Sequence, residues 1–268
     1  MGNIRPTFAI VVLVVSCVHV QAQTREHLNV ASGRPVATAV NILEKKYGWV
    51  ITYEDPEYVN DADLRDATPP WYVPANHPPN LQKIIVPRGG ALNFEYPVVN
   101  GHPTEDTGNL LSRMIESYGL GSHPEFQVLH RNMPVGALQV TEWHVVPTKV
   151  LDKDGNLSPA DPILDTVIAI PSEKRTALEM VGAICQELSR VMRKRVVVGM
   201  VPLNPLMNNA RERSAPAQPA RDILADTLNR ERPGYSWELY YDPSGFYALN
   251  VHWIDVHVTP PVPRRQPQ

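Results

Sequence analysis

The sequence lacks several features that would assign it to a class at once. It has two cysteines, Cys17 and Cys185, so no internal disulfide can form if an N-terminal leader containing Cys17 is removed. Its 25 Lys and Arg residues are outnumbered by 28 Asp and Glu residues, which argues against a nucleic-acid binder held by bulk charge. No apolar run reaches the roughly 20 residues that a membrane-spanning helix needs. With 43% hydrophobic residues, the composition is that of a folded globular protein.

Local signatures of catalysis and of metal binding are also missing. There is no Gly-x-Ser-x-Gly elbow, Ser-x-x-Lys, His-Glu-x-x-His or Cys-x-x-Cys pattern. The segment 150–161 resembles part of a calcium loop, but Val150 and Asp161 occupy its first and twelfth positions, so we interpret it as a polar turn. His252 would point away from Asp255 and His257 on a strand, which disfavours a zinc site there. The sequence therefore indicates no catalytic residue, cofactor or metal ligand, and it leaves enzymatic activity open while favouring its absence.

The first 22 residues have the layout of a secretory signal peptide. Arg5 supplies the positive charge, residues 8–15 form a short apolar run, and cleavage after Ala22 follows small or tolerated residues. A second interpretation stays open, because residues 14–17 resemble a lipobox in which Cys17 is acylated. We therefore expect an exported protein, periplasmic or secreted, with a lipid anchor at Cys17 as the alternative to cleavage after Ala22.

Residues 31–147 and 150–258 show one pattern twice. In the first stretch an amphipathic helix over 36–47 is ended by Gly48 and followed by a strand over 49–53. A second helix precedes a hairpin over 126–140, which aligns without gaps with residues 237–251. The sequence predicts an α+β fold of two tandem modules, each ordered helix, strand, strand, helix and hairpin, with mixed sheets and helices packed on one face.

Several element ends are predicted from single residues. Thr104 is the expected cap of the first module's second helix, and Ser172 the expected cap of the second module's first helix, after a strand over 164–170 closed by Pro171. Pro219 is the expected first-turn residue of the last helix.

The middles of the two modules differ. Residues 55–103 form a proline-rich insertion in the first module, and residues 202–218 form a shorter polar loop in the second. Trp71 and Tyr72 lie in the insertion, where they either dock on the core, which we favour, or stay exposed as a contact for a partner or a glycan. The tail over 259–268 is expected to be disordered.

Residues 36–53 and 220–251 resemble the small α+β modules of secretins and of the short N-terminal (STN) domain of TonB-dependent receptors. The shared features are an amphipathic helix, a glycine and a short strand in the first segment, and a helix and hairpin in the second. The resemblance implies a periplasmic, cell-envelope location and protein–protein contacts. This chain has no barrel or secretin gate after the modules and carries the insertion at 55–103, so a pore or transport role is not implied.

Two hypotheses about function follow. The first is a non-enzymatic binding or scaffolding protein of the cell envelope, which contacts a protein partner through an exposed strand edge or the 55–103 segment. The second is an exported hydrolase-like enzyme whose site is assembled from residues distant in sequence. The second hypothesis requires a deep pocket with convergent titratable groups, for which His102, His123 and His130 are the best material.

Overall fold

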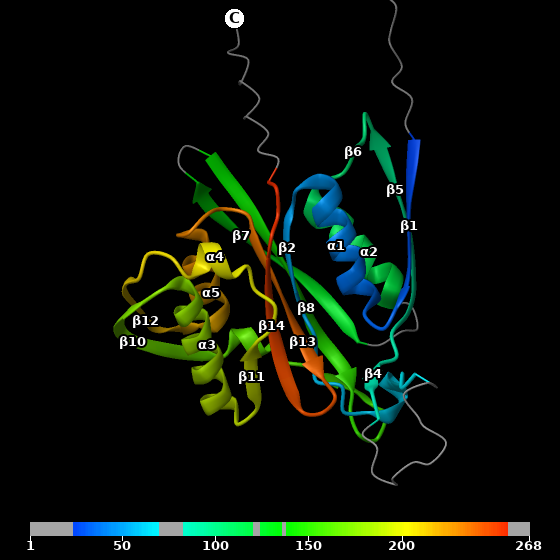
Figure 1. The fold of residues 1–268 in the computed structure, drawn as a ribbon. Coiled ribbons are helices and arrows are strands. Elements are labelled where there is room, and N and C mark those ends of the chain that lie inside the picture. The colour runs from blue at the N-terminus through cyan, green and yellow to red at the C-terminus, as the bar shows by residue number, and fades with distance from the viewer. Residues whose placement is uncertain (1–23, 70–82, 120–123, 136–137, 257–268) are drawn as a thin grey trace, which may run out of the picture.

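A mixed β-sheet runs through the centre of the molecule (Figure 1). The structure is a computed structural model and describes residues 24–69, 83–119, 124–135 and 138–256. The strand order of this sheet is β11 (Arg195–Val198), β14 (Phe246–Trp253), β13 (Tyr235–Asp242), β2 (Val50–Glu54), β8 (Leu138–Leu151) and β7 (Glu125–Val135), and β9 (Leu157–Pro159) pairs with β8 beside this path. Helices pack against the sheet, so the predicted α+β class is confirmed.

The first half of the chain builds two layers on one face of the sheet. Strands β1 (Thr24–Ser32) and β5 (Gly90–Val99) form an antiparallel outer pair, and Figure 1 shows helices α1 (Pro35–Tyr47) and α2 (Thr107–Gly119) between that pair and the central sheet. Shorter elements fill the connection from β2 to α2: η1 (Asp61–Asp63), β3 (Leu64–Asp66), β4 (Ile85–Pro87) and β6 (His102–Pro103). The insertion thus contains strand structure on both sides of residues 70–82, which lie outside the described residues.

The second half follows the same order of connections on the opposite face of the sheet (Figure 1). Its outer antiparallel pair is β10 (Val167–Arg175) with β12 (Arg211–Pro219), and its helices are α3 (Ala177–Met192) and α5 (Ala220–Asn229). Two short helices complete it: η3 (Ile163–Asp165) and α4 (Leu203–Leu206). In both halves the first strand after a helix pairs in parallel with the last strand of the hairpin.

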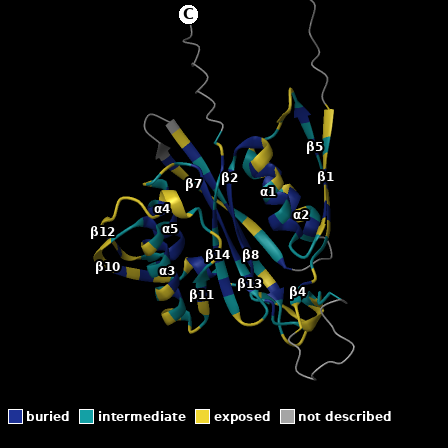
Figure 2. Ribbon diagram, viewed as in Figure 1, coloured by how far each residue is buried: buried dark blue, intermediate teal, exposed yellow. Residues whose placement is uncertain are grey.

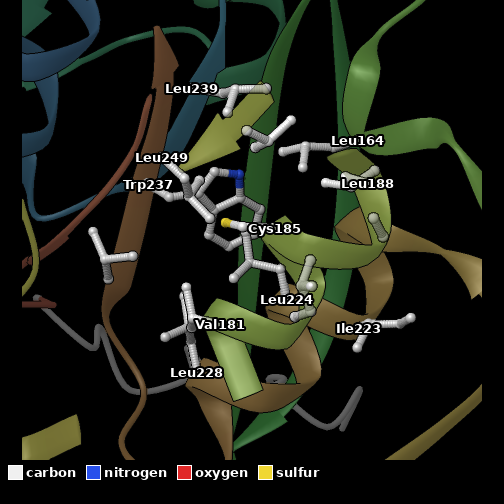
Figure 3. Packing of buried hydrophobic residues seen from close by; sticks show 14 of the residues in the cluster. Leu164, Val181, Cys185, Leu188, Ile223, Leu224, Leu228, Trp237, Leu239 and Leu249 are labelled. Carbon is white, nitrogen blue, oxygen red and sulfur yellow. The ribbon is translucent and has the colours of Figure 1, made fainter. Parts of the chain in front are cut away.

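Each half has its own hydrophobic core. Leu43, Ile51 and Leu111 belong to the cluster around α1 and α2, and Trp237 lies at the centre of the cluster that α3 and α5 cover (Figure 3). In Figure 2 the central strands are mainly dark blue, whereas yellow marks the outward sides of the helices. Two separate apolar clusters on opposite faces make the shared sheet the wall of both cores.

The helix ends have local causes. Gly48 ends α1 in the left-handed region, with φ of 65°, and its N–H donates to the Glu44 carbonyl at 2.8 Å. A capping box starts α3, because the Thr176 hydroxyl accepts from the Glu179 N–H while the Glu179 carboxylate accepts from the Thr176 N–H. For α2, the Asp106 side chain accepts from the Asn109 N–H at 3.0 Å.

Five sequence-based expectations differ from the structure in detail. Ser172 does not cap α3 but lies in β10, which continues past Pro171, and Asp106 caps α2 in place of Thr104. Residues 211–219 form β12 where a loop was expected, and β1 begins at Thr24, before the expected start of the first module at residue 31. The hairpins match on their first strands at the predicted offset, but the hairpin of β7 and β8 is longer, so their second strands do not match at that offset.

The two halves join where β13 pairs in parallel with β2. Glu238 lies opposite Tyr53 and Leu239 opposite Glu54 in this short seam. Its ladder continues beyond β2, because the Asp55 N–H donates to the Leu239 carbonyl at 2.8 Å. Few backbone hydrogen bonds hold the seam, so its stability depends on the side chains around it.

A fully buried carboxylate, that of Asp55, secures one end of the seam. Its Oδ2 accepts from the Arg34 Nε at 2.6 Å and from the Tyr241 N–H at 3.0 Å, while its Oδ1 accepts from the Tyr53 and Tyr58 hydroxyls at 2.8 and 3.2 Å. Arg34 also donates to the Tyr241 carbonyl at 2.6 Å. A buried charge is stable only when it is paired and hydrogen-bonded, and these four donors meet that requirement.

We expect Asp55→Ala to lower the free energy of unfolding by about 3–5 kcal/mol, because it removes one partner of a buried ion pair. Chemical denaturation followed by tryptophan fluorescence measures the change. Asp61→Ala is the control, since Asp61 is an exposed acidic residue nearby. A loss below about 1 kcal/mol for Asp55→Ala, the size of a surface substitution, would show that the seam does not depend on this carboxylate.

Candidate partner-binding groove

A groove of about 760 Å³ runs beside strand β5. Its walls come from the middle of β5 at residues 93–95, from α2 and from the first residues of β7. The apolar lining consists of Phe94, Ile115 and Phe126, and the charged lining of Glu95, Arg113, Glu116 and Glu125. The groove therefore combines an aromatic floor with a charged rim.

One edge of β5 is open along most of its length. On its other edge, β1 pairs with every residue from Gly90 to Val98. On the side away from β1, within the part of the chain that the structure describes, Val98 and Val99 pair with β6, and the Pro97 carbonyl accepts from the Thr104 N–H at 3.1 Å. No strand pairs with residues 90–96 on that side. An open edge presents unpaired N–H and C=O groups that an added strand can use.

The sequence of β5 explains how the edge and the groove arise together. Leu92, Phe94, Tyr96 and Val98 alternate with more exposed residues, so the apolar set faces α1 and α2 while Asn93 and Glu95 face outward. The strand is held in place by its buried face, and its backbone edge needs no second partner to stay ordered.

The rim of the groove is acidic. Three carboxylates and one guanidinium line it, and three of these groups have partners. Glu95 pairs with Arg25 and Arg113 with Glu105, each at 2.6 Å, and Glu125 pairs with Lys149 at 2.9 Å. The Arg113 guanidinium also lies over the Phe94 ring, 5.4 Å from its centroid. This rim favours a segment that carries positive charge beside apolar side chains.

A second candidate site is a buried polar cluster under α5. Burial raises the pKa of Glu142 to about 8 and lowers the pKa of His144 to about 3. His144 Nδ1 lies 2.8 Å from the Thr52 hydroxyl, and its ring lies 5.6 Å from that of Trp237. Strongly shifted groups of this kind are candidates for acid–base chemistry.

The surroundings of this cluster favour a structural role. Arg221 of α5 donates to Glu54 at 2.8 Å and to Asp165 at 2.9 Å, which ties α5 to the end of β2. Neither carboxylate oxygen of Glu142 has a hydrogen-bond partner among the described residues. Neither Glu142 nor His144 lines the groove or the three smaller cavities, of about 190, 160 and 310 Å³, so no route for a substrate leads to them from these cavities.

The cavity of about 190 Å³ lies at the start of α1. Arg34, Tyr53 and Tyr58 line it, but all three donate hydrogen bonds to the Asp55 carboxylate. These three polar groups thus serve the seam.

The structure does not gather the residues singled out from the sequence. Trp71, Tyr72, His123 and His257 lie outside the described residues. His102 and His130 are exposed, and neither lines the groove. The segment 150–161 contains the predicted polar turn, in which the Asp152 side chain accepts from the Asp154 and Asn156 N–H groups. Within the described ranges, no group of three or more His, Cys, Asp and Glu side chains could hold a metal ion.

No protein-family model, curated protein or solved structure matches this chain. Among the helices that the structure describes, none is both long and apolar enough to cross a membrane. The groove and the open sheet edges are therefore the features that bear on function.

The shifted pKa values predict how stability varies with pH. Between pH 4.5 and 8 the folded chain keeps a proton on Glu142 that the unfolded chain has released, so the free energy of unfolding falls as pH rises. Between pH 6.5 and 3 the unfolded chain binds a proton at His144 that the folded chain does not, so the free energy of unfolding falls as pH drops. The two effects together place the highest stability near pH 4.5–6.5.

We expect Glu142→Gln to remove the loss of stability between pH 6.5 and 8, because glutamine has no proton to lose. Between pH 4.5 and 6.5 the effect of His144 then stands alone, so stability should rise with pH there instead of staying level. Denaturation midpoints measured from pH 4 to 8.5 test this, with the groove residue Glu116→Gln as the control. Parallel pH profiles for the natural chain and Glu142→Gln would exclude Glu142 as the source of the slope.

Proposed function

We propose that this chain is an exported cell-envelope protein that binds a protein partner and does not transform it. An extended segment of the partner adds to β5 as a further strand, and its alternate side chains enter the groove. The observation that carries the proposal is the coincidence of an unpaired strand edge with an apolar groove along the same strand.

The chemistry of the groove specifies the kind of segment. Main-chain hydrogen bonds to β5 supply affinity without regard to sequence, and the floor of Phe94, Ile115 and Phe126 selects apolar side chains at every second position. The acidic rim selects basic residues between them. A segment with apolar residues alternating with Lys or Arg meets these requirements.

The export assignment and the resemblance to secretin and TonB-receptor modules belong to the same proposal. The leader over 1–22 lies outside the described residues, so mass measurement of the N-terminus of the mature protein is the test. A mass that starts at Gln23 supports signal-peptide cleavage, and a mass that starts at an acylated Cys17 supports a lipoprotein. An N-terminus at Met1 on protein from intact cells contradicts export by either route.

An exported hydrolase-like enzyme is the second candidate. Glu142 and His144 are the observation in its favour, because their pKa values are strongly shifted. Their burial under α5 argues against it, since a hydrolase must admit both substrate and water. Binding therefore accounts better for the open, accessible features of the molecule.

Partner binding in the groove is tested by filling it. A Cβ added at Gly119 or at Gly182 meets no atom of the described residues within 4 Å, so a side chain can start at either position without a clash, and only Gly119 lines the groove. We expect Gly119→Trp to abolish, and Gly182→Trp to preserve, cross-linking of an envelope protein to a photoreactive residue placed at Glu116. The same photoreactive residue at Lys153, an exposed turn away from the groove, gives the background.

Equal cross-linking by Gly119→Trp and Gly182→Trp would place the contact outside the groove. Turnover of a substrate by the purified chain, lost in Glu142→Gln, would favour the enzyme instead.

A further inference from the structure

The two halves of the central sheet are related by a simple operation. The first half contributes β2, β8 and β7 in that order, and the second contributes their counterparts β11, β14 and β13 in the same order. Because β13 is parallel to β2 whereas its counterpart β7 is antiparallel to β8, the second half is turned by half a revolution about an axis across the strands. That half-turn also explains why the helices of the two halves lie on opposite faces (Figure 1).

The correspondence between the halves extends to single hydrogen bonds. The Ile51 N–H donates to the Glu44 side chain at 3.0 Å, and the Val196 N–H donates to the Ser189 hydroxyl at 2.8 Å. Both donor and acceptor lie 145 positions later in the second half. Helix and strand are thus joined by the same bridge at the same register in both halves.

When the half-turn relates the two halves, two strand edges pair at the seam and the two equivalent edges stay open. Inside the chain, the edge of β13 pairs with the edge of β2. Their counterparts are β7 and β11, which end the sheet on opposite sides. In the described part of the chain, no strand pairs with β7 on the side away from β8, or with β11 on the side away from β14.

We propose that a second copy of this chain pairs its β11 in parallel with β7, which repeats the internal seam between molecules. The contact is head-to-tail, so each copy keeps one open edge and the assembly grows along the sheet. One half-turn relates the two halves of a copy, and a second relates that copy to the next. Each copy therefore has the orientation of the one before it, apart from a translation along the sheet and the twist of the sheet. The product is an open filament.

The side chains at the two open edges fit this contact. In the internal seam Glu238 lies opposite Tyr53. Their counterparts are Gln127 of one copy and Val198 of the next, so these two residues lie opposite each other in the proposed register. Leu129, which is 36% exposed, takes the place of Tyr240, whose ring packs against that of Tyr53 at 6.1 Å. An exposed leucine at the edge would therefore cover the half-buried Val198 of the next copy.

The charges also correspond. Inside the chain, Arg131 of β7 forms an ion pair with Asp226 of α5. The counterpart of Arg131 is Asp242 of β13, and the counterpart of Asp226 is Arg113 of α2. The signs are exchanged but remain opposite, so this position of the intermolecular contact is complementary as well.

Disulfide trapping tests the register. The variants Gln127→Cys and Val198→Cys are made separately in a chain that carries Cys17→Ser, and the buried Cys185 is retained. Opposite residues on neighbouring strands are close enough for a disulfide. We expect a cross-linked dimer when the two variants are mixed and oxidised, and none with either variant alone.

Arg195→Cys, three residues along β11 from Val198, is the register control and should not cross-link to Gln127→Cys. Dimers from one variant alone would indicate a symmetric contact, and equal yields with Arg195→Cys would indicate random collision. Either result overturns the proposal.

A substitution at an exposed residue outside the hydrophobic clusters tests the association itself. We expect Leu129→Lys to return the protein to a monomer in sedimentation velocity, while Leu157→Lys leaves the natural association unchanged. Leu157 is 37% exposed and lies in β9, away from both edges, so the two leucines are matched in exposure. A natural chain that sediments as a monomer at its highest soluble concentration overturns the proposal. The contact shares strand β7 and Arg113 with the groove beside β5, but Leu129 does not line that groove, so cross-linking at Glu116 should be unchanged in Leu129→Lys.

Discussion

The molecule depends on one short parallel contact between strands that lie far apart in the sequence. At the seam of β2 and β13, two halves with separate cores become one sheet, and each half covers part of the other's polar back face. The seam itself supplies few backbone hydrogen bonds, so buried polar side chains hold it from both faces. Asp55 holds the face of α1, and Glu54 with Arg221 holds the face of α5. These buried groups are stabilised because each one binds a partner from the other half.

The elements whose causes are local could be predicted from the sequence. The apolar stripe of α1 and its stop at Gly48 indicate one helix, and the strand that follows is rich in β-formers. β12 was missed because its sequence is polar and contains proline, and its place is set by pairing with β10, not by its own propensity. The capping box of Thr176 and Glu179 is present in the sequence, but a strand that ends at Pro171 favours Ser172 as the helix cap. The strand β10 instead continues to Arg175, which moves the start of α3 to Ala177.

The candidate site could be predicted only in outline. The sequence predicts a partner contact at an exposed strand edge or in the 55–103 segment. The groove itself requires β5, α2 and β7 to lie together, and the periodicity of a single element does not indicate which elements pack against it. The pair Glu142 and His144 was invisible for a related reason. An alternation of polar and apolar residues in β8 is typical of a strand with one solvated face, whereas here that face lies under α5 of the other half.

The distance along the chain between the two seam strands has a consequence for biosynthesis. The Tyr241 N–H that binds Asp55 lies 186 residues later, and ribosomes add about 5–20 residues each second, so β2 exists for roughly 10–40 s before its neighbour is made. During that interval the nascent first half exposes the edge of β2 and the ionisable group of Asp55 together. A chaperone that shields this edge, or export before folding, would protect the newborn chain from pairing with the wrong strand.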